Sequence, residues 1–245
     1  MFQAFIINLS QAEERKTLMQ KQIQKFQDID FIFFDAISVG SREFLSYRQK
    51  WDCDFLTKIY RGKTLTDGEK ACFASHYALW QKCIELNRPI LILEDDVLFF
   101  EDFEIKVKDL FLNPRWQFVR LMPLFKKRSV HIEGDLYQVL EGVCGTQGYF
   151  LTPRAALAFV QKAKLWFCPV DNFLDKAYWH GIRTFFFSPP IIAENSALQS
   201  CIDSVGKREL RKVQKTFFGY KITKECLNAL EWIWRKYDEW TKSNK

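Results

Sequence analysis

The alternation of apolar and polar stretches near the N-terminus predicts the start of a β-α-β unit. The opening MFQAFIINLS contains a short apolar run that is typical of a strand, and a second run, DFIFFDAI, follows at 30–37. Between them, Ser10 and Glu13 have the spacing of a capping box, which predicts a helix that runs to about Phe26. A strand, a helix and a strand in this order predict a parallel, largely buried sheet.

The segment 65–89 has the clearest helical pattern in the first half of the chain. Thr66 and Glu69 form a second capping box, and Asn87 with Pro89 ends the helix. Apolar or small residues recur at helical spacing, at Cys72, Ser75, Leu79, Cys83 and Leu86. The mixed, polar segment 38–64 before it predicts short helices and loops.

The rest of the chain also alternates between predicted strands and helices. Further strands are predicted at 116–122, 136–140, 148–152 and 183–187, with a helix at 153–164, and the last forty residues have a helical pattern. The sequence therefore predicts an α/β fold with a central, mostly parallel sheet flanked by helices. We expect one domain at 1–205 and a helical C-terminal extension at 206–245.

One strand ends in three successive acids. ILIL at 90–93 is apolar at every position, which is typical of a strand buried on both faces, and Glu94, Asp95 and Asp96 follow it directly. Ligands bind at the carboxyl ends of such strands in open α/β sheets. Partial burial of three adjacent carboxylates is costly, and a divalent cation with a phosphate-bearing ligand would offset this cost. The alternative is a strand that ends in an ordinary polar loop.

Composition narrows the function classes. The chain has 245 residues, 48% of them hydrophobic and 16% aromatic, which is enough for one sizeable core and excludes a disordered protein. No apolar run approaches the ~20 residues of a membrane span. The N-terminus lacks the basic region of a signal peptide, so we expect a cytoplasmic location. The seven cysteines include no C-x-x-C pair, which argues against a disulfide framework or a zinc knuckle.

The positive charge is concentrated at the C-terminus. Residues 206–245 contain 11 Lys and Arg against 5 Asp and Glu, a balance of +6 that equals the formal net charge of the whole chain. This predicts attraction to an anionic surface, for which an acidic membrane leaflet and nucleic acid are both eligible. No basic stripe with interleaved aromatic residues lies near the acidic strand end, so we expect no nucleic-acid partner. A solvated basic helix face is the alternative.

Several segments together resemble glycosyltransferase family 25, which includes bacterial lipooligosaccharide galactosyl- and glucosyltransferases and is related to collagen galactosyltransferase domains. ILEDDV resembles the signature of that family. Other segments resemble its blocks in the same order over about residues 1–205: FIINLSQAEERK, FFDAI, LTDGEKACFASHYALW, GTQGYFLTPRAALAFV, PVDNFL and SPPIIAENSALQSCI. One departure is Ala71, which stands where the family has Gly, and alanine is well tolerated in a helix.

The resemblance implies an inverting enzyme whose GT-A-like catalytic domain is 1–205. Its donor would be a UDP-hexose carrying galactose or glucose, its cofactor Mn²⁺ or Mg²⁺, and its acceptor a lipid-linked oligosaccharide of the bacterial lipooligosaccharide or lipopolysaccharide core. Such an acceptor would make peripheral contact of 206–245 with the inner membrane useful. Packing of the apolar face of this segment on the domain or in a dimer is the alternative. The oligomeric state stays open.

The acids and the helix at 66–86 are the candidates for the chemistry. Asp96 is expected to ligate the metal directly, and Glu94, on the same side of the strand end, contacts the metal or the ribose. Asp95 either orients its neighbours or touches the donor sugar. His76 is either a hydrogen-bonded core residue or a catalytic residue that borders the donor site, with Ser75 beside it.

The second part of the chain offers a candidate base. Asp171 follows Pro169 and either caps a helix or acts as the catalytic base, with Asp175 as its substitute. Gly148 permits close backbone approach to a ligand, and Tyr149 can stack on a sugar ring.

The remaining predicted donor contacts lie early in the chain. Arg15 either pairs with a nucleotide phosphate or lies on a solvated helix face, and Asn8 and Asp35 are predicted nucleotide contacts at strand ends.

Two other functions fit the acidic strand end. Metal-dependent phosphoryl transfer or nuclease activity uses similar acids, but the segment lacks the D-x-D-x-T order of haloacid-dehalogenase phosphatases. A noncatalytic sugar-binding relative is the other alternative, and the intact acid triplet argues against it.

Overall fold

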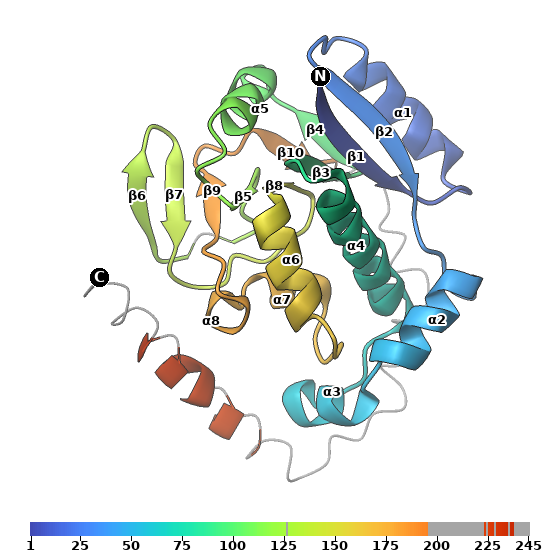
Figure 1. Ribbon diagram of the computed structural model, residues 1–245, viewed down its shortest axis with the longest axis vertical. Coiled ribbons are helices and arrows are strands. Elements are labelled where there is room, and N and C mark those ends of the chain that lie inside the picture. Colours follow the sequence, from blue (N-terminus) through green and yellow to red (C-terminus); the bar gives the residue numbers. More distant parts are fainter. Residues whose placement is uncertain (126, 196–222, 224, 228, 235, 238–245) are drawn as a thin grey trace.

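An eight-stranded mixed sheet forms the centre of the molecule (Figure 1). The computed structural model describes residues 1–125, 127–195, 223, 225–227, 229–234 and 236–237. Across the sheet the strands are β2 (Ile29–Asp35), β1 (Phe2–Asn8), β3 (Ile90–Glu94), β8 (Gly148–Leu151), β5 (Phe118–Arg120), β9 (Phe185–Phe187), β7 (Leu136–Val139) and β6 (Ser129–Glu133). The short strands β4 (Val97–Phe99) and β10 (Ile192–Glu194) pair with each other.

The sheet contains both parallel and antiparallel pairs of strands. β1 is parallel to both β2 and β3, and β5 is parallel to β9, as expected from the β-α-β pattern. β8 is antiparallel to both of its neighbours, β3 and β5, and β7 is antiparallel to β9. The prediction of an α/β fold is confirmed, but the sheet is mixed rather than mostly parallel, because a short apolar run carries no signal for its direction.

Helices cover both faces of the sheet (Figure 1). The helices are α1 (Glu13–Ile23), α2 (Arg42–Trp51), α3 (Asp54–Arg61), α4 (Asp67–Leu86), α5 (Phe103–Leu112), α6 (Pro153–Lys162), α7 (Val170–Leu174) and α8 (Ala177–His180). Because side chains alternate along a strand, β3 contributes to two cores. Ile90 and Ile92 pack in the cluster that contains residues of α4 and α6, whereas Leu91 and Leu93 pack with residues of α1 and α5.

The two predicted capping boxes have different outcomes. At the start of α4 the Thr66 hydroxyl accepts from the Glu69 backbone N–H at 3.0 Å, and the Glu69 carboxylate accepts from the Thr66 N–H at 2.8 Å, so this box is confirmed. The predicted capping box at Ser10 and Glu13 is wrong, because α1 begins after Ala12 and has no side-chain cap. The chain turns between Leu9 and Ala12, where the Ala12 N–H donates to the Leu9 carbonyl, and this turn delays the helix.

Glu231 and Trp234 of the C-terminal segment contact the rest of the protein. Glu231 accepts a bond of 2.5 Å from Lys176, and the hydroxyls of Tyr60 and Tyr178 contact the same carboxylate oxygen. Trp234 stacks near Trp179. The predicted boundary at 205 and the basic residues Lys207, Arg208, Arg211, Lys212 and Lys215 lie outside the described residues. No helix in the described part of the chain is long and apolar enough to cross a membrane.

Candidate functional site

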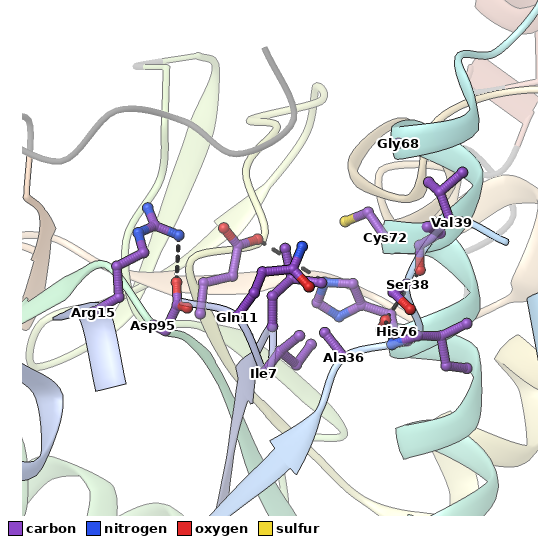
Figure 2. A pocket seen from close by; sticks show the side chains of 15 residues that line it. Ile7, Gln11, Arg15, Ala36, Ser38, Val39, Gly68, Cys72, His76 and Asp95 are labelled. Atoms are coloured by element: carbon purple, nitrogen blue, oxygen red, sulfur yellow. Dashed lines mark hydrogen bonds and ion pairs between the residues drawn. The ribbon is translucent and has the colours of Figure 1, made fainter. Parts of the chain in front are cut away.

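A cavity of about 400 Å³ opens at the carboxyl ends of the three parallel strands β2, β1 and β3 (Figure 2). The segments that follow β1 and β2 form part of its wall, α4 forms another, and Glu94 and Asp95 lie at its base. Figure 2 places Arg15 and Asp95 on one side of the cavity and His76 and Cys72 of α4 on the other. This is the edge where the sequence predicts a ligand.

Asp95 is held by two donors that come from the first β-α connection. Asn8 Nδ2 donates to Asp95 Oδ2 at 2.7 Å, and Arg15 Nη1 donates to Asp95 Oδ1 at 2.5 Å. Arg15 also reaches Asp96, with Nη2 2.6 Å from Oδ2. Burial raises the pKa of Asp95, while the Asn8 hydrogen bond and the Arg15 charge oppose that rise. Asn8 therefore contacts the acid cluster, and of these two donors Arg15 is the one that forms part of the cavity wall.

The surroundings of Glu94 strongly raise the pKa of its carboxyl group. Its carboxylate accepts a hydrogen bond from the Thr146 hydroxyl. Burial raises the pKa of Glu94 to about 8, and the negative charge of Asp96 adds to the rise, whereas the Thr146 bond opposes it. A cation bound near this carboxyl group would lower its pKa, because a positive charge favours the ionised form.

His76 lies deep in the wall made by α4. Its Nδ1 is 2.8 Å from the Tyr149 hydroxyl, and its Nε2 is 3.9 Å from Glu94 Oε1. Burial, with a contribution from the Arg120 charge, lowers the pKa of His76 to about 3, so the imidazole is neutral at pH 7. His76 is thus a buried, hydrogen-bonded residue that also forms part of the cavity wall, and its catalytic role stays a prediction.

The structure argues against three predicted donor contacts, Tyr149, Gly148 and Asp35, and places a fourth, Ser75, in the cavity wall. Tyr149 is 0% exposed, so its ring is not available for stacking on a sugar, and this prediction is wrong. Gly148 is also buried, and a Cβ there would lie 2.6 Å from Ile192 Cδ1, so packing requires the glycine. Asp35 is exposed and is not among the residues that line the cavity. The Ser75 hydroxyl lines it, but it bonds the Ile37 N–H and the Ala71 carbonyl.

Asp171 and Asp175 have different surroundings. Both oxygens of Asp175 are engaged, Oδ1 by Arg120 at 2.9 Å and Oδ2 by the Cys144 N–H at 2.8 Å. Asp171 is not the N-cap of α7, because Pro169 occupies that position. Burial raises the pKa of the Asp171 carboxyl. Burial also raises the pKa of Cys72 in the cavity wall, and the charges of Glu94 and Asp171 add to that rise. Asp171 thus acts electrostatically on the same wall as Glu94.

The residues at the end of β3 fit a cation that takes some of its ligands from a substrate. Asp96 Oδ1 is buried and has no hydrogen-bond partner among the described residues, and Glu94 supplies a second carboxylate. Mg²⁺ is often held by one or two carboxylates together with substrate phosphates. In the described ranges no group of three or more His, Cys, Asp and Glu side chains is placed to hold a metal ion. The donor set therefore fits an open two-carboxylate site and does not fit a closed one.

Sequence reasoning missed two residues that act on this site. Thr146 bonds Glu94 from the loop before β8, and only the antiparallel pairing of β3 with β8 reveals that closeness. Trp80 donates to the Tyr149 hydroxyl at 2.9 Å. Its position four residues after His76 on a predicted helix is a signal that both side chains share a face.

Comparisons with known proteins identify related chains. One relative is the lipooligosaccharide biosynthesis protein lic2B of Haemophilus influenzae, 33% identical over 165 residues, which are 62% of this chain and 59% of the relative. The lacto-N-neotetraose biosynthesis glycosyltransferase LgtE of Neisseria meningitidis is 26% identical over 89% of this chain and 88% of its own length. Procollagen galactosyltransferase 1-B of Xenopus laevis is 29% identical over 72% of this chain and 31% of the relative.

The family model covers the part of the chain that builds the site. Residues 1–124 and 117–174 match the model described as glycosyltransferase family 25 (LPS biosynthesis protein). The chain spans about three fifths of the length of lic2B and most of the length of the meningococcal LgtE. The matched residues include α4 with His76, β3 and the acids Asp95 and Asp96 that follow it, and α7 with Asp171. The chain belongs to glycosyltransferase family 25.

Proposed function

We propose that this protein is a metal-dependent, inverting glycosyltransferase that moves galactose or glucose from a UDP-sugar to a lipooligosaccharide or lipopolysaccharide core acceptor. The observation that carries the proposal is the cavity at the carboxyl ends of β1, β2 and β3, where Glu94, Asp95, Arg15 and His76 meet. Family membership supports the reaction class, and the similarity to lic2B, a lipooligosaccharide biosynthesis protein, supports the acceptor class.

The acids at the end of β3 would serve the leaving group. Glu94 and Asp96 would hold Mn²⁺ or Mg²⁺, which when bound supplies Lewis-acid stabilisation of the charge on the UDP diphosphate. Asp95 is fixed by Asn8 and Arg15 and so keeps its neighbours in place. The guanidinium of Arg15 lies in the cavity wall, where its positive charge favours binding of a diphosphate.

Asp171 is the proposed catalytic base. An acceptor hydroxyl has a pKa far above neutrality and must lose its proton to a nearby group as it attacks the sugar carbon. The raised pKa of the Asp171 carboxyl, caused mainly by burial, makes it a stronger base than an exposed aspartate. Asp175 is a poorer choice, since Arg120 and the Cys144 N–H occupy its oxygens.

The C-terminal segment is proposed to contact an anionic membrane surface. In the described part of this segment Trp232 is 62% exposed and Ile233 is 51% exposed, and the residues from 206 onward carry the excess of Lys and Arg. Exposed tryptophan combined with basic residues favours an interfacial position. Co-sedimentation with anionic vesicles but not with neutral ones, reduced by Trp232→Ser, is the expected result. Equal recovery with both vesicle types would contradict the contact.

Ligand binding and a single substitution test the proposed reaction. Thermal unfolding with UDP, UDP-galactose and UDP-glucose should show stabilisation that depends on Mn²⁺, because a ligand that binds the folded state raises its stability. Asp96→Asn should reduce hexose transfer roughly 100-fold or more and leave the fold intact. Asp102→Asn removes a surface carboxylate that pairs with Lys106 and is the matched control. Near-normal transfer by Asp96→Asn refutes the metal assignment, and cleavage of DNA without UDP binding refutes the reaction.

A further inference from the structure

The two ring nitrogens of His76 have different surroundings. Nδ1 lies 2.8 Å from the Tyr149 hydroxyl. Nε2 is buried and has no hydrogen-bond partner among the described residues. The nearest acid oxygen, Glu94 Oε1, is 3.9 Å away, which is too long for a hydrogen bond, and it already accepts from Thr146. His76 forms part of the cavity wall (Figure 2), and with Nδ1 engaged by Tyr149, Nε2 is the ring nitrogen that lacks a partner among the described residues.

Trp80 determines the direction of the Tyr149 hydroxyl. The indole Nε1 of Trp80 is 2.9 Å from the phenol oxygen, and an indole nitrogen can only donate. If His76 Nδ1 also donated to that oxygen, the phenol proton would have no acceptor among the described residues. Tyr149 is 0% exposed, and a buried donor without a partner is costly. The phenol proton therefore goes to His76 Nδ1, which acts as an acceptor.

A neutral imidazole whose Nδ1 accepts must carry its proton on Nε2. An Nδ1 that accepts the phenol proton carries no proton itself, so the ring is neutral. We propose that Trp80 and Tyr149 are positioning residues that hold His76 in the Nε2–H tautomer, so that His76 donates a hydrogen bond to an oxygen of the ligand in the cavity. The identity of that ligand rests on the proposed function: phosphate and hydroxyl oxygens of a UDP-hexose are acceptors.

Nitrogen NMR tests the tautomer without any ligand. In protein with ¹⁵N-labelled histidine, a protonated ring nitrogen is well separated in chemical shift from an unprotonated one, and His76→Gln assigns the His76 signals. We expect the proton on Nε2 in the wild type and a mixture of tautomers in Tyr149→Phe and in Trp80→Phe. Tyr47→Phe removes another phenol, which bonds Gln81 at 2.8 Å, and should leave the signals unchanged. A proton on Nδ1 in the wild type, or unchanged signals in both Tyr149→Phe and Trp80→Phe, overturns the inference.

Calorimetric titration tests the ligand bond. With Mn²⁺ present, Tyr149→Phe should raise the Kd for UDP-galactose or UDP-glucose roughly fivefold or more, the effect of one weakened hydrogen bond, while Tyr47→Phe should not. An equal rise for UDP alone places the bond at the diphosphate, and a rise confined to the UDP-hexose places it at the sugar. Unchanged affinity for every compound refutes the ligand bond. If the wild type binds none of these compounds, both the proposed function and the ligand assignment are refuted. The tautomer of His76 is then still decided by the NMR result.

Discussion

Arg15 illustrates how one side chain holds several acids in a small space. It joins α1 to the loop after β3 by bonding both Asp95 and Asp96, and its side chain is 13% exposed. Without that guanidinium, Asp95 and Asp96 would lie beside Glu94 with less positive charge to offset their repulsion. The position of the acids therefore depends on a residue from the first helix of the chain.

We expect Arg15→Gln to lower the free energy of unfolding by about 1–3 kcal/mol, less than the loss for a fully buried ion pair, since water still reaches part of the site. Arg15→Lys keeps the charge but not the two-pronged geometry and should lie between Gln and the wild type. Urea unfolding measures each value. Arg42→Gln at an exposed position is the control, and an Arg15→Gln protein as stable as this control would show that Asp95 and Asp96 need no such partner.

At the scale of a helix, α4 depends on the capping box at its first turn. Thr66→Ala removes the hydroxyl that accepts from the Glu69 N–H, and we expect a loss of about 1 kcal/mol of unfolding free energy. Thr66→Ser keeps an acceptor in place and should retain most of that stability. The comparison is made by chemical unfolding of both variants. Equal losses for Ala and Ser would indicate that the lost methyl group, rather than the cap, explains the effect.

At the scale of a strand, β8 can approach its neighbours only because Gly148 has no side chain. A Cβ there would lie 2.6 Å from Ile192 Cδ1 and 2.9 Å from Leu93 Cδ2. We expect Gly148→Ala to destabilise the protein by about 1–3 kcal/mol through overpacking. Adding Ile192→Val removes the nearest atom and should restore part of the loss in thermal unfolding. A double variant less stable than the sum of the two single changes would argue against this explanation.

Sequence reasoning predicted the elements that carry strong local signals. The opening strand, the helix at 66–86 with its cap, and ILIL before the acids all have patterns that local physics produces, and each is present. The helices α5 and α8 and the strands β4, β6 and β10 were not predicted. β4 and β10 have three residues each and pair with each other from distant parts of the chain, and β6 is mostly exposed, so the local apolar pattern of these strands is weak.

The predicted site was less complete than the predicted fold for a physical reason. Glu94 and Asp95 lie at the cavity because a buried strand places its last residues at the sheet edge. Burial of Tyr149 depends instead on which face of β8 points toward α4, and the alternation GYFL fits either face. Thr146 contacts Glu94 only through the antiparallel pairing of two strands that are far apart in sequence.

At the scale of the whole molecule, Glu231 connects the C-terminal segment to the buried Lys176. Burial alone would raise the pKa of Glu231, but the Lys176 charge and the hydrogen bonds from Lys176, Tyr178 and Tyr60 lower it below its ordinary value of 4.5. A carboxyl whose folded pKa is depressed contributes stability above its unfolded pKa and loses it as the pH falls through the folded value. The contact should therefore persist at neutral pH and weaken below about pH 4.5.

Limited proteolysis and tryptophan fluorescence between pH 3 and pH 7 measure this release, because Trp234 lies beside Trp179 when the segment is in place. Glu231→Gln should be cleaved faster at pH 7 and should lose most of the pH dependence below pH 4.5. Glu225→Gln changes another glutamate of the segment and is the control. The same pH profile in Glu231→Gln and in the wild type would assign the effect to other groups.

The reversed direction of β8 bears on how enzymes with this architecture could diversify. Because β8 runs against β3, the loop at 140–147 enters the sheet at the edge where β3 leaves it, and Thr146 near its end reaches Glu94. Insertions or exchanges in this loop would alter the immediate neighbours of the acid while every paired strand keeps its register. We expect a chimera that carries another member's loop to acquire altered substrate preference on an unchanged scaffold.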